Sequence, residues 1–381
     1  MKFHLWMPNL FGFKGGIQVY SAFFLQALQN LYPQAQYDVF LKHDVQATSD
    51  IPYLPQTRFH FTGAAAIKIR TLIFSTQIIS TSLQERPDLI ITTHLNFTVA
   101  AHWLKRLTGI PYWTVAHGIE AWDIKNATIK TALQHADKIL AVSGYTRDRL
   151  LQEQNLDPNK VSILPNTFNP HRFKRAPKPI YLLKKYHLKP EQPILLTVSR
   201  LAAAERYKGY DQILKALPQI RQLIPDVHYI IVGKGNDRAR IEQLIARLGL
   251  QDRVTLAGFV HDQQICDYYN LCDVFAMPSK REGFGIVYLE ALACGKPVLG
   301  GNQDGAIDAL CHGELGALVN PDNLSEIINA IVKIIHYAYP NSLMYQPEAL
   351  RQKVIDTFGF DRFQQTLASH LDQHFPAMKR S

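Results

Sequence analysis

The sequence predicts an α/β protein of two domains, each built on a doubly wound parallel sheet. The first observation is length, because 381 residues exceed what one hydrophobic core usually supports. The second is periodicity: short, continuous apolar runs alternate with amphipathic helical patterns, in two successive series. Parallel strands that helices cover on both faces have this pattern. The third is a stretch rich in proline and cations that separates the two series.

The first series supplies the strands of an N-terminal domain, predicted over residues 1–168. The run at 3–7 is its first strand, because the N-terminus has no cleavage site of a secretory signal. A glycine pair, Gly15 and Gly16, then precedes a helical pattern. The other apolar runs of this series lie at residues 37–41, 88–94, 112–118, 138–144 and 161–166.

The second series forms a C-terminal domain, predicted over residues 169–360. The proline-rich segment 165–193 is interpreted as the linker, with a short helix inside it. Helical patterns cover residues 210–224, 237–248 and 286–293. The apolar runs lie at residues 194–200, 229–233, 254–258, 274–279, 297–301 and 316–320.

The net charge indicates which kinds of partner to expect, and the cysteine content indicates the redox compartment. A formal net charge of +9 suggests an anionic partner, which can be nucleic acid, a phosphorylated small molecule or an acidic membrane surface. Zinc-finger spacing and aromatic RNA-binding strands are absent from the sequence, and the basic residues are scattered, so nucleic acid is not expected. The four cysteines form no C-x-x-C pair and are interpreted as buried thiols in a reducing cytosol. No uncharged run is long enough to span a membrane.

A turn with two nearby glutamates marks the candidate site. The stretch Glu282-Gly283-Phe284-Gly285 leaves a predicted strand and enters a helix that carries Glu290. Ligands of open parallel sheets bind at the carboxyl ends of the strands. The two glycines leave room for backbone N–H groups at the helix start to approach an anion. The carboxylates suit the hydroxyls of a sugar and a ribose; the alternative is a helix cap and a buried, hydrogen-bonded glutamate.

Two cations follow the first strand of the second series. Arg200 lies at its carboxyl end and Lys208 just before a glycine, a pair that suits a diphosphate. The alternative is a solvated pair of loop charges. Another strand ends in a turn at Gly233 and Gly235, but position 238 is arginine, so the dinucleotide fingerprint G-x-G-x-x-G is incomplete. This argues against a nicotinamide-dependent oxidoreductase.

Several motifs in order resemble the retaining glycosyltransferases of family four. They are "SRL…ERYKGYD", "VGKGND", "LAGFV", "MPSKREGFGIVYLEALACGKPV" and "GELGALVNPDN", in which the E-x7-E pair of Glu282 and Glu290 is the most specific. In the first domain the resemblance rests on "GFKGGIQVYSAFFLQAL", "AHGIE" and "AVSGYTRDRL". It implies the GT-B fold, two Rossmann-like domains facing across a cleft. It also implies that a last helix, 361–375, packs back on the first domain.

The resemblance implies a role for each candidate in the second domain. Arg200 and Lys208 would bind the donor diphosphate, helped by the N–H groups of the glycine-flanked turn. Glu282 would contact hydroxyls of the donor sugar. Glu290 would hold the ribose, and the backbone near Val260 would receive the base.

In the first domain the resemblance implies two contributors. Gly16 would approach the phosphate and His117 would face the sugar and the acceptor; the alternatives are an ordinary turn and a hydrogen-bonded loop histidine. The family's usual double glycine before a proline-glutamate pair is replaced here by "NQDGAID". Asp304 in that segment would lie near the donor sugar, or would serve only as a turn residue.

The predicted activity is transfer of a hexose, with retained configuration, from a nucleotide sugar such as UDP-glucose to a saccharide acceptor in polysaccharide or glycan biosynthesis. Both free and lipid-linked saccharides are candidate acceptors. No two aspartates lie two residues apart, so an Asp-x-Asp metal site is absent from the sequence. Arg200, Lys208 and a helix N-terminus could stabilise the leaving group instead, so neither a metal nor another cofactor is expected. The alternatives are a non-hydrolysing UDP-sugar epimerase and a non-catalytic nucleotide-sugar binding protein.

The location is predicted to be cytoplasmic, with peripheral membrane contact as an addition. Residues 64–80, "AAAIKIRTLIFSTQIIS", are mostly apolar with two cations. Together with the net positive charge they suggest reversible contact with an anionic membrane. The alternative is a buried helix.

Overall fold

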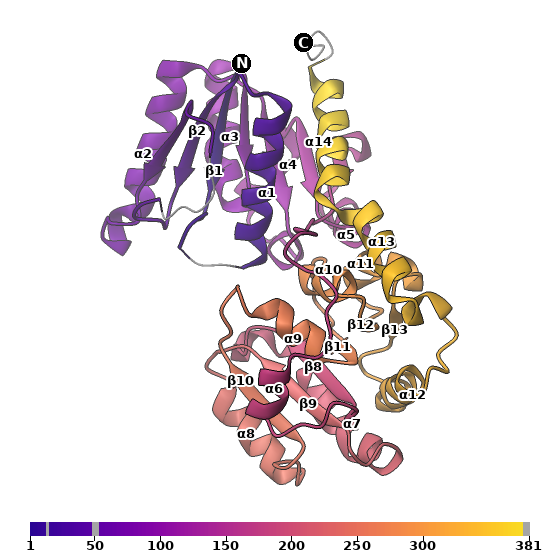
Figure 1. Ribbon diagram of the computed structural model, residues 1–381. Helices are drawn as coiled ribbons and strands as arrows, with labels where there is room; N and C mark the ends of the chain where they lie inside the picture. Colours follow the sequence, from indigo (N-terminus) through magenta and orange to yellow (C-terminus); the bar gives the residue numbers. More distant parts are fainter. Residues whose placement is uncertain (13–14, 48–52, 376–381) are drawn as a thin grey trace. The chain divides into compact units, whose positions relative to one another are not determined.

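The chain forms two compact units (Figure 1). The computed structural model describes residues 1–12, 15–47 and 53–375. The first unit comprises Met1–Thr167 and Phe360–Ser381, and the second comprises Phe168–Gly359. Phe13 and Lys14, which belong to the glycine-rich stretch singled out above, lie outside the described residues.

The first unit is built on a seven-stranded parallel sheet in the order β3-β2-β1-β4-β5-β6-β7. The chain runs outward from β1 to β3 and then returns to β4 on the other side of β1. Ligands of such sheets bind where the strand order reverses, here between β1 and β4. The strands are β1 (Lys2–Met7), β2 (Gln36–Leu41), β3 (Thr57–Phe61), β4 (Leu89–Thr92), β5 (Tyr112–Ala116), β6 (Lys138–Ala141) and β7 (Val161–Ile163).

Helices cover both faces of this sheet, which explains why inner strands such as β1, β2 and β5 are buried along nearly their whole length. On one face, α1 and the C-terminal α14 run side by side in Figure 1, and Phe363 of α14 packs edge-on against Tyr20 of α1. The other face packs on α2 and α3. The helices are α1 (Gly16–Leu31), α2 (Ile67–Glu85), α3 (Thr98–Thr108), α4 (Ala127–His135), α5 (Gly144–Gln154) and α14 (Phe360–His374).

The second unit has a six-stranded parallel sheet in the order β10-β9-β8-β11-β12-β13. The order reverses between β8 and β11. The strands are β8 (Ile194–Val198), β9 (His228–Val232), β10 (Val254–Gly258), β11 (Val274–Met277), β12 (Val298–Gly301) and β13 (Ala317–Val319). The helices are α6 (Ile180–Lys185), α7 (Tyr210–Leu223), α8 (Arg238–Arg247), α9 (Ile265–Leu271), α10 (Ile286–Ala293), α11 (Ala306–Ala309), α12 (Leu324–Ile335) and α13 (Pro347–Phe358).

Three details differ from the sequence analysis. Strand β3 was not predicted, because "TRFHF" is only partly buried at the sheet edge and lacks a continuous apolar run. The segment interpreted as a linker packs within the second unit, where Lys178 lies 2.7 Å from Asp273. The cysteines are all free thiols, but Cys266 and Cys311 are partly exposed rather than buried.

No helix in the described part of the chain combines the length and the apolarity that a membrane span requires.

Candidate functional site

The candidate residues of the second unit gather at the carboxyl edge of its sheet, around the point where the strand order reverses. Arg200 follows β8, and Glu282 lies between β11 and α10. Strands β8 and β11 are the two central strands of this sheet, and they pair directly with each other. The sequence motifs at 199–211 and 277–298 are therefore neighbours in space.

The centre of the site is an ion pair between Lys208 and Glu282. The Lys208 Nζ lies 2.5 Å from the Glu282 carboxylate, and the side chains are only 16% and 17% exposed. Burial lowers the pKa of Lys208, but the Glu282 carboxylate outweighs it and holds this pKa above its usual value. The next residue, Gly209, has φ 87°, and a Cβ there would lie 2.4 Å from the Pro278 carbonyl oxygen. Only glycine lets the lysine loop approach the end of β11 this closely.

Arg200 presents a more open cation beside this pair. Its guanidinium lies 2.5 Å from the Glu205 carboxylate, and its side chain is 58% exposed. Glu205 is almost covered, with 13% exposure, and belongs to the short helix that ends at Lys208. The structure therefore gives each cation its own carboxylate, and more than half of the arginine side chain is exposed.

Asp304 holds the Glu282 loop in place. It is fully buried, and its carboxylate accepts hydrogen bonds from the Ser279 hydroxyl at 2.7 Å, from the Glu282 N–H at 2.7 Å and from the Ala306 N–H at 3.0 Å. The Gly305 N–H donates to the Glu282 carbonyl at 2.8 Å. Burial raises the pKa of Asp304 to about 6 despite these bonds. Asp304 thus acts through the backbone of Glu282.

The glycine-flanked turn begins α10 without a side-chain cap. The N-cap is Gly285, with φ 90°, and a Cβ there would lie 2.4 Å from the Tyr288 ring. Phe284 is buried against Phe358, with ring centroids 5.3 Å apart. Because Glu282 pairs with Lys208 and makes no capping bond to α10, the interpretation of Glu282 as a helix cap is wrong.

Glu290 lies farther along α10. The Tyr269 hydroxyl donates to its carboxylate at 2.6 Å, and the side chain stays partly exposed. Burial raises the pKa of Glu290 to about 7. At the end of β10, Phe259 is 57% exposed next to Val260, and the Lys234 Nζ lies 4.7 Å from the Phe259 ring centroid.

The first unit places Gly16 at the carboxyl edge of its own sheet. Gly16 is the exposed first residue of α1, preceded by Gly15 in an extended conformation and without a side-chain cap. The loop between β1 and α1 is held by Asp44, whose carboxylate accepts the N–H groups of Leu10, Phe11 and Gly12. Asp44 was not predicted from the sequence as a contributor to this loop.

His117 follows β5 and is neutral. Its Nε2–H donates to the Thr93 carbonyl at 3.0 Å, and its ring lies edge-on to Tyr20 with centroids 5.0 Å apart. Burial lowers the pKa of His117 to about 3, and the neighbouring His94 adds to this. A neutral ring that donates through Nε2 offers Nδ1 as an acceptor. Gly16 and His117 belong to the first unit, and all other candidates to the second.

Each of the two units matches a known family model. Residues 182–348 match the family model described as Glycosyl transferases group 1. Residues 14–172 match the model described as Glycosyltransferase Family 4. The chain belongs to family four of the glycosyltransferases. The predicted GT-B fold is confirmed.

Individual relatives and solved structures are similar to this chain at 21–30% sequence identity. A GDP-mannose-dependent phosphatidylinositol monomannoside mannosyltransferase of Mycolicibacterium smegmatis is 30% identical over 56% of this chain and 58% of its own length. The chain thus spans a little over half of that relative. A 2-deoxystreptamine glucosyltransferase of Streptomyces kanamyceticus is 25% identical over 80% of this chain and 83% of its own. The structure of Anabaena HepE in complex with UDP has a TM-score of 0.77 at 21% identity, covering 98% of this chain and 100% of that chain.

Proposed function

We propose that this protein is a hexosyltransferase that moves a sugar, with retained configuration, from a UDP-hexose such as UDP-glucose to a saccharide acceptor. The observation that carries the proposal is the Lys208–Glu282 pair at the reversal point of a doubly wound sheet. It combines a covered cation for a phosphate with a carboxylate for sugar hydroxyls.

The second unit offers one group for each part of a nucleotide sugar. Arg200 and Lys208 bind the diphosphate, aided by the uncapped start of α10. Each charge-assisted hydrogen bond contributes about 1.5–3 kcal/mol. Glu282 binds the sugar, and Glu290 the ribose. The exposed ring of Phe259, next to Val260, is a surface on which a base can stack.

The chemical step is proposed to need no metal. As the sugar leaves, negative charge develops on the diphosphate, and Arg200 and Lys208 stabilise that charge. Glu282 lies against the hydroxyl edge of the sugar, where it orients the donor and stabilises developing positive charge. The departing phosphate accepts the proton of the attacking hydroxyl, which gives same-face attack and retention.

The choice of UDP is supported by HepE, which was solved with UDP, whereas the M. smegmatis relative is GDP-mannose-dependent. The test is a mass-spectrometric screen of the purified chain against UDP- and GDP-hexoses with a panel of saccharide acceptors. We expect a glycosylated product that forms in excess chelator, with the donor's anomeric configuration by proton NMR. Isomerised donor without acceptor would indicate the epimerase. Binding without turnover would indicate the non-catalytic protein, and an inverted product would contradict the mechanism.

Glu290 predicts a pH dependence of nucleotide binding. An ionised carboxylate is the stronger acceptor for ribose hydroxyls. Because burial raises its pKa to about 7, Glu290 is largely protonated below that pH and ionised above it. UDP affinity should therefore rise up to about tenfold between about pH 6 and about pH 8.

The control is Glu290→Gln, which should bind UDP more weakly at high pH and lose this part of the pH dependence. UDP and Asp304 still ionise in the variant. The difference between the pH profiles of the two proteins is therefore due to Glu290. Parallel calorimetric pH profiles for the two proteins would contradict the assignment.

The acceptor is proposed to be reached at an anionic membrane surface, as a lipid-linked saccharide. The first turns of α2 expose Ile67, Ile69 and Leu72, with 80%, 50% and 68% exposure, beside Lys68 and Arg70. The buried face of α2 is confined to Phe74, Ile78 and Ser82. Exposed apolar groups flanked by cations are typical of interfacial helices.

Vesicle flotation at low salt tests this contact. We expect binding to anionic vesicles and at least several-fold less binding for Ile67→Ser/Leu72→Ser, because two apolar anchors are lost. The control is Leu223→Ser, which changes a 57% exposed leucine of the second unit. Equal binding of both variants, or no binding of the unaltered protein, would contradict the contact.

A further inference from the structure

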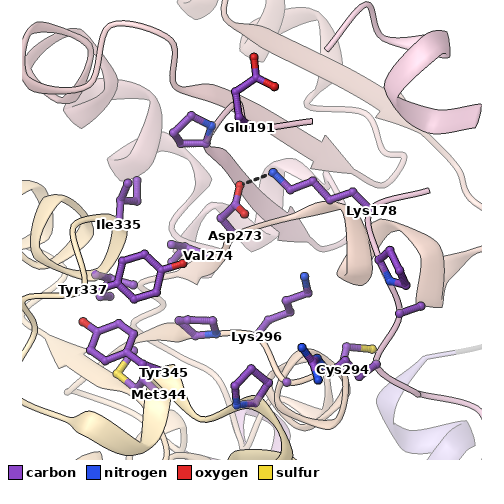
Figure 2. Close-up of a pocket in the computed structure, with 18 residues that line it drawn as sticks. Lys178, Glu191, Asp273, Val274, Cys294, Lys296, Ile335, Tyr337, Met344 and Tyr345 are labelled. Carbon is purple, nitrogen blue, oxygen red and sulfur yellow. Dashed lines mark hydrogen bonds and ion pairs between the residues drawn. The ribbon is translucent and has the colours of Figure 1, made fainter. Parts of the chain in front are cut away.

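The second unit has a pocket of about 440 Å³ that the proposed transfer does not use (Figure 2). Its lining includes Pro193, Asp273 and Pro297, which directly precede β8, β11 and β12, respectively. The pocket therefore lies at the amino ends of these strands. Arg200 and Glu282 lie at the opposite, carboxyl edge of the same sheet.

One wall of the pocket displays an aromatic side chain in a strained position. Tyr337 is 77% exposed and has φ 57°. It follows His336, the C-cap of α12; the Tyr337 N–H donates to the Ile334 carbonyl, and the next N–H donates to the Lys333 carbonyl. Glycine is favoured at this type of helix end, because a bulky residue at positive φ is strained. Tyr337 thus exposes its ring at a position that glycine usually occupies.

A second tyrosine extends this wall. Tyr345 lies beside Tyr337, with ring centroids 5.2 Å apart and planes inclined by 46°. Figure 2 shows both rings on the same side of the pocket, above Met344. Met344 and Val274 line the pocket and are buried. The pocket thus combines aromatic rings with an apolar floor, as small-molecule sites commonly do.

The polar lining mixes donors with acceptors. Lys178 lies 2.7 Å from the Asp273 carboxylate, and its Nζ also donates to the Gln192 carbonyl at 2.9 Å. The Lys296 Nζ donates to the Asn270 carbonyl at 2.9 Å. Glu191 adds a second carboxylate to the lining, and Arg175 adds a third cation, which lies 2.7 Å from the Glu348 carboxylate. Two carboxylates oppose a phosphate, whereas sugar hydroxyls both donate and accept hydrogen bonds and suit paired ammonium and carboxylate groups.

We propose that this pocket binds a neutral oligosaccharide. The rings of Tyr337 and Tyr345 stack on the C–H faces of the sugar units, and Lys178, Asp273 and Lys296 bind hydroxyls. The pocket lies at the amino ends of the strands, and the donor residues lie at the opposite, carboxyl edge, so oligosaccharide binding here does not depend on catalysis at the donor residues.

The test is saturation-transfer difference NMR of the full chain with maltohexaose, cellohexaose and α-1,6-linked mannohexaose. We expect at least one to bind, and to bind at least tenfold more weakly to Tyr337→Gly. The melting temperature of this variant should rise by about 2–4 °C, because glycine relieves the strain. Loss of binding together with a higher melting temperature excludes unfolding as the cause. Lys296→Met should also weaken binding.

Three outcomes would overturn the proposal. The first is equal affinity of the unaltered protein and Tyr337→Gly; the surviving binding would then belong to an acceptor site, and the proposed transferase function would stand. The second is no binding of any of the three oligomers. The third is displacement of a bound oligomer by inorganic phosphate at constant ionic strength, which would assign the pocket to an anion.

Discussion

Glu282→Gln is expected to reduce the rate of sugar transfer by about 10²–10³-fold, the usual effect of removing one stabilising group from a transition state. The substitution keeps the shape of the side chain but removes the charge that faces the sugar. UDP carries no sugar at this position, so UDP affinity should change little. The lost interaction therefore lowers kcat more than it raises KM.

Glu314→Gln is a matched control for this change. Glu314 also pairs with a lysine, Lys353, at 2.7 Å, but both side chains are about half exposed. Exposed pairs contribute little, so the control should keep nearly full activity. If Glu282→Gln transfers sugar as fast as the control, Glu282 has no role in the step. A covalent glycosyl adduct on Glu282, detected by mass spectrometry, would instead make it a nucleophile.

Arg200→Ala and Lys208→Ala should each weaken UDP binding by about tenfold or more, since each removes a charge-assisted bond to the diphosphate. Lys208→Ala also leaves the Glu282 carboxylate unpaired at 17% exposure, so this variant should be less stable as well. Arg200→Ala changes a residue that is 58% exposed and should fold normally. Calorimetric titration with UDP measures both variants.

Arg221→Ala is the comparison for the arginine. Arg221 pairs with Asp252 at 2.9 Å near the end of α7 and plays no part in the proposed site. We expect it to bind UDP like the unaltered protein. Unchanged UDP affinity in both Arg200→Ala and Lys208→Ala would place the diphosphate elsewhere.

Much of the sheet architecture could be predicted, because helices bury both faces of these strands and so require continuous apolar runs. The run at 194–200 contains β8 (Ile194–Val198), and the run at 229–233 overlaps β9 (His228–Val232). A partly buried edge strand could also be predicted where it is apolar, as in β10 with "VTLAG". Strand β3 escaped prediction because "TRFHF" has no continuous apolar run. Periodicity therefore misses an edge strand that lacks such a run.

The site could be predicted only in part, because local motifs do not specify tertiary partners. Arg200, Lys208 and Glu282 were identified from segments that follow strand ends, and Glu290 from the helix after the Glu282 turn, yet their roles remain proposals. The pairing of Lys208 with Glu282 joins residues from two loops and has no signal in either. Likewise, nothing near Tyr269 indicates that its hydroxyl donates to Glu290.

Asp304 shows what a departure from a family pattern can mean. The sequence left open whether it affects the donor or only the turn. In the structure its carboxylate is buried and accepts the Glu282 N–H, so its direct contact is with the loop. A glycine at this position could not make these bonds. The departure is therefore explained by how the chain supports Glu282.

A crystal structure of the full chain with UDP bound tests most directly whether the second unit binds the nucleotide at the proposed residues. We expect the diphosphate oxygens within hydrogen-bond distance, about 2.7–3.2 Å, of Arg200 and Lys208. We also expect the ribose hydroxyls at the same distance from Glu290 and the base beside Val260. A nucleotide that binds away from these residues, or that reaches Glu290 with its phosphates, would contradict this assignment.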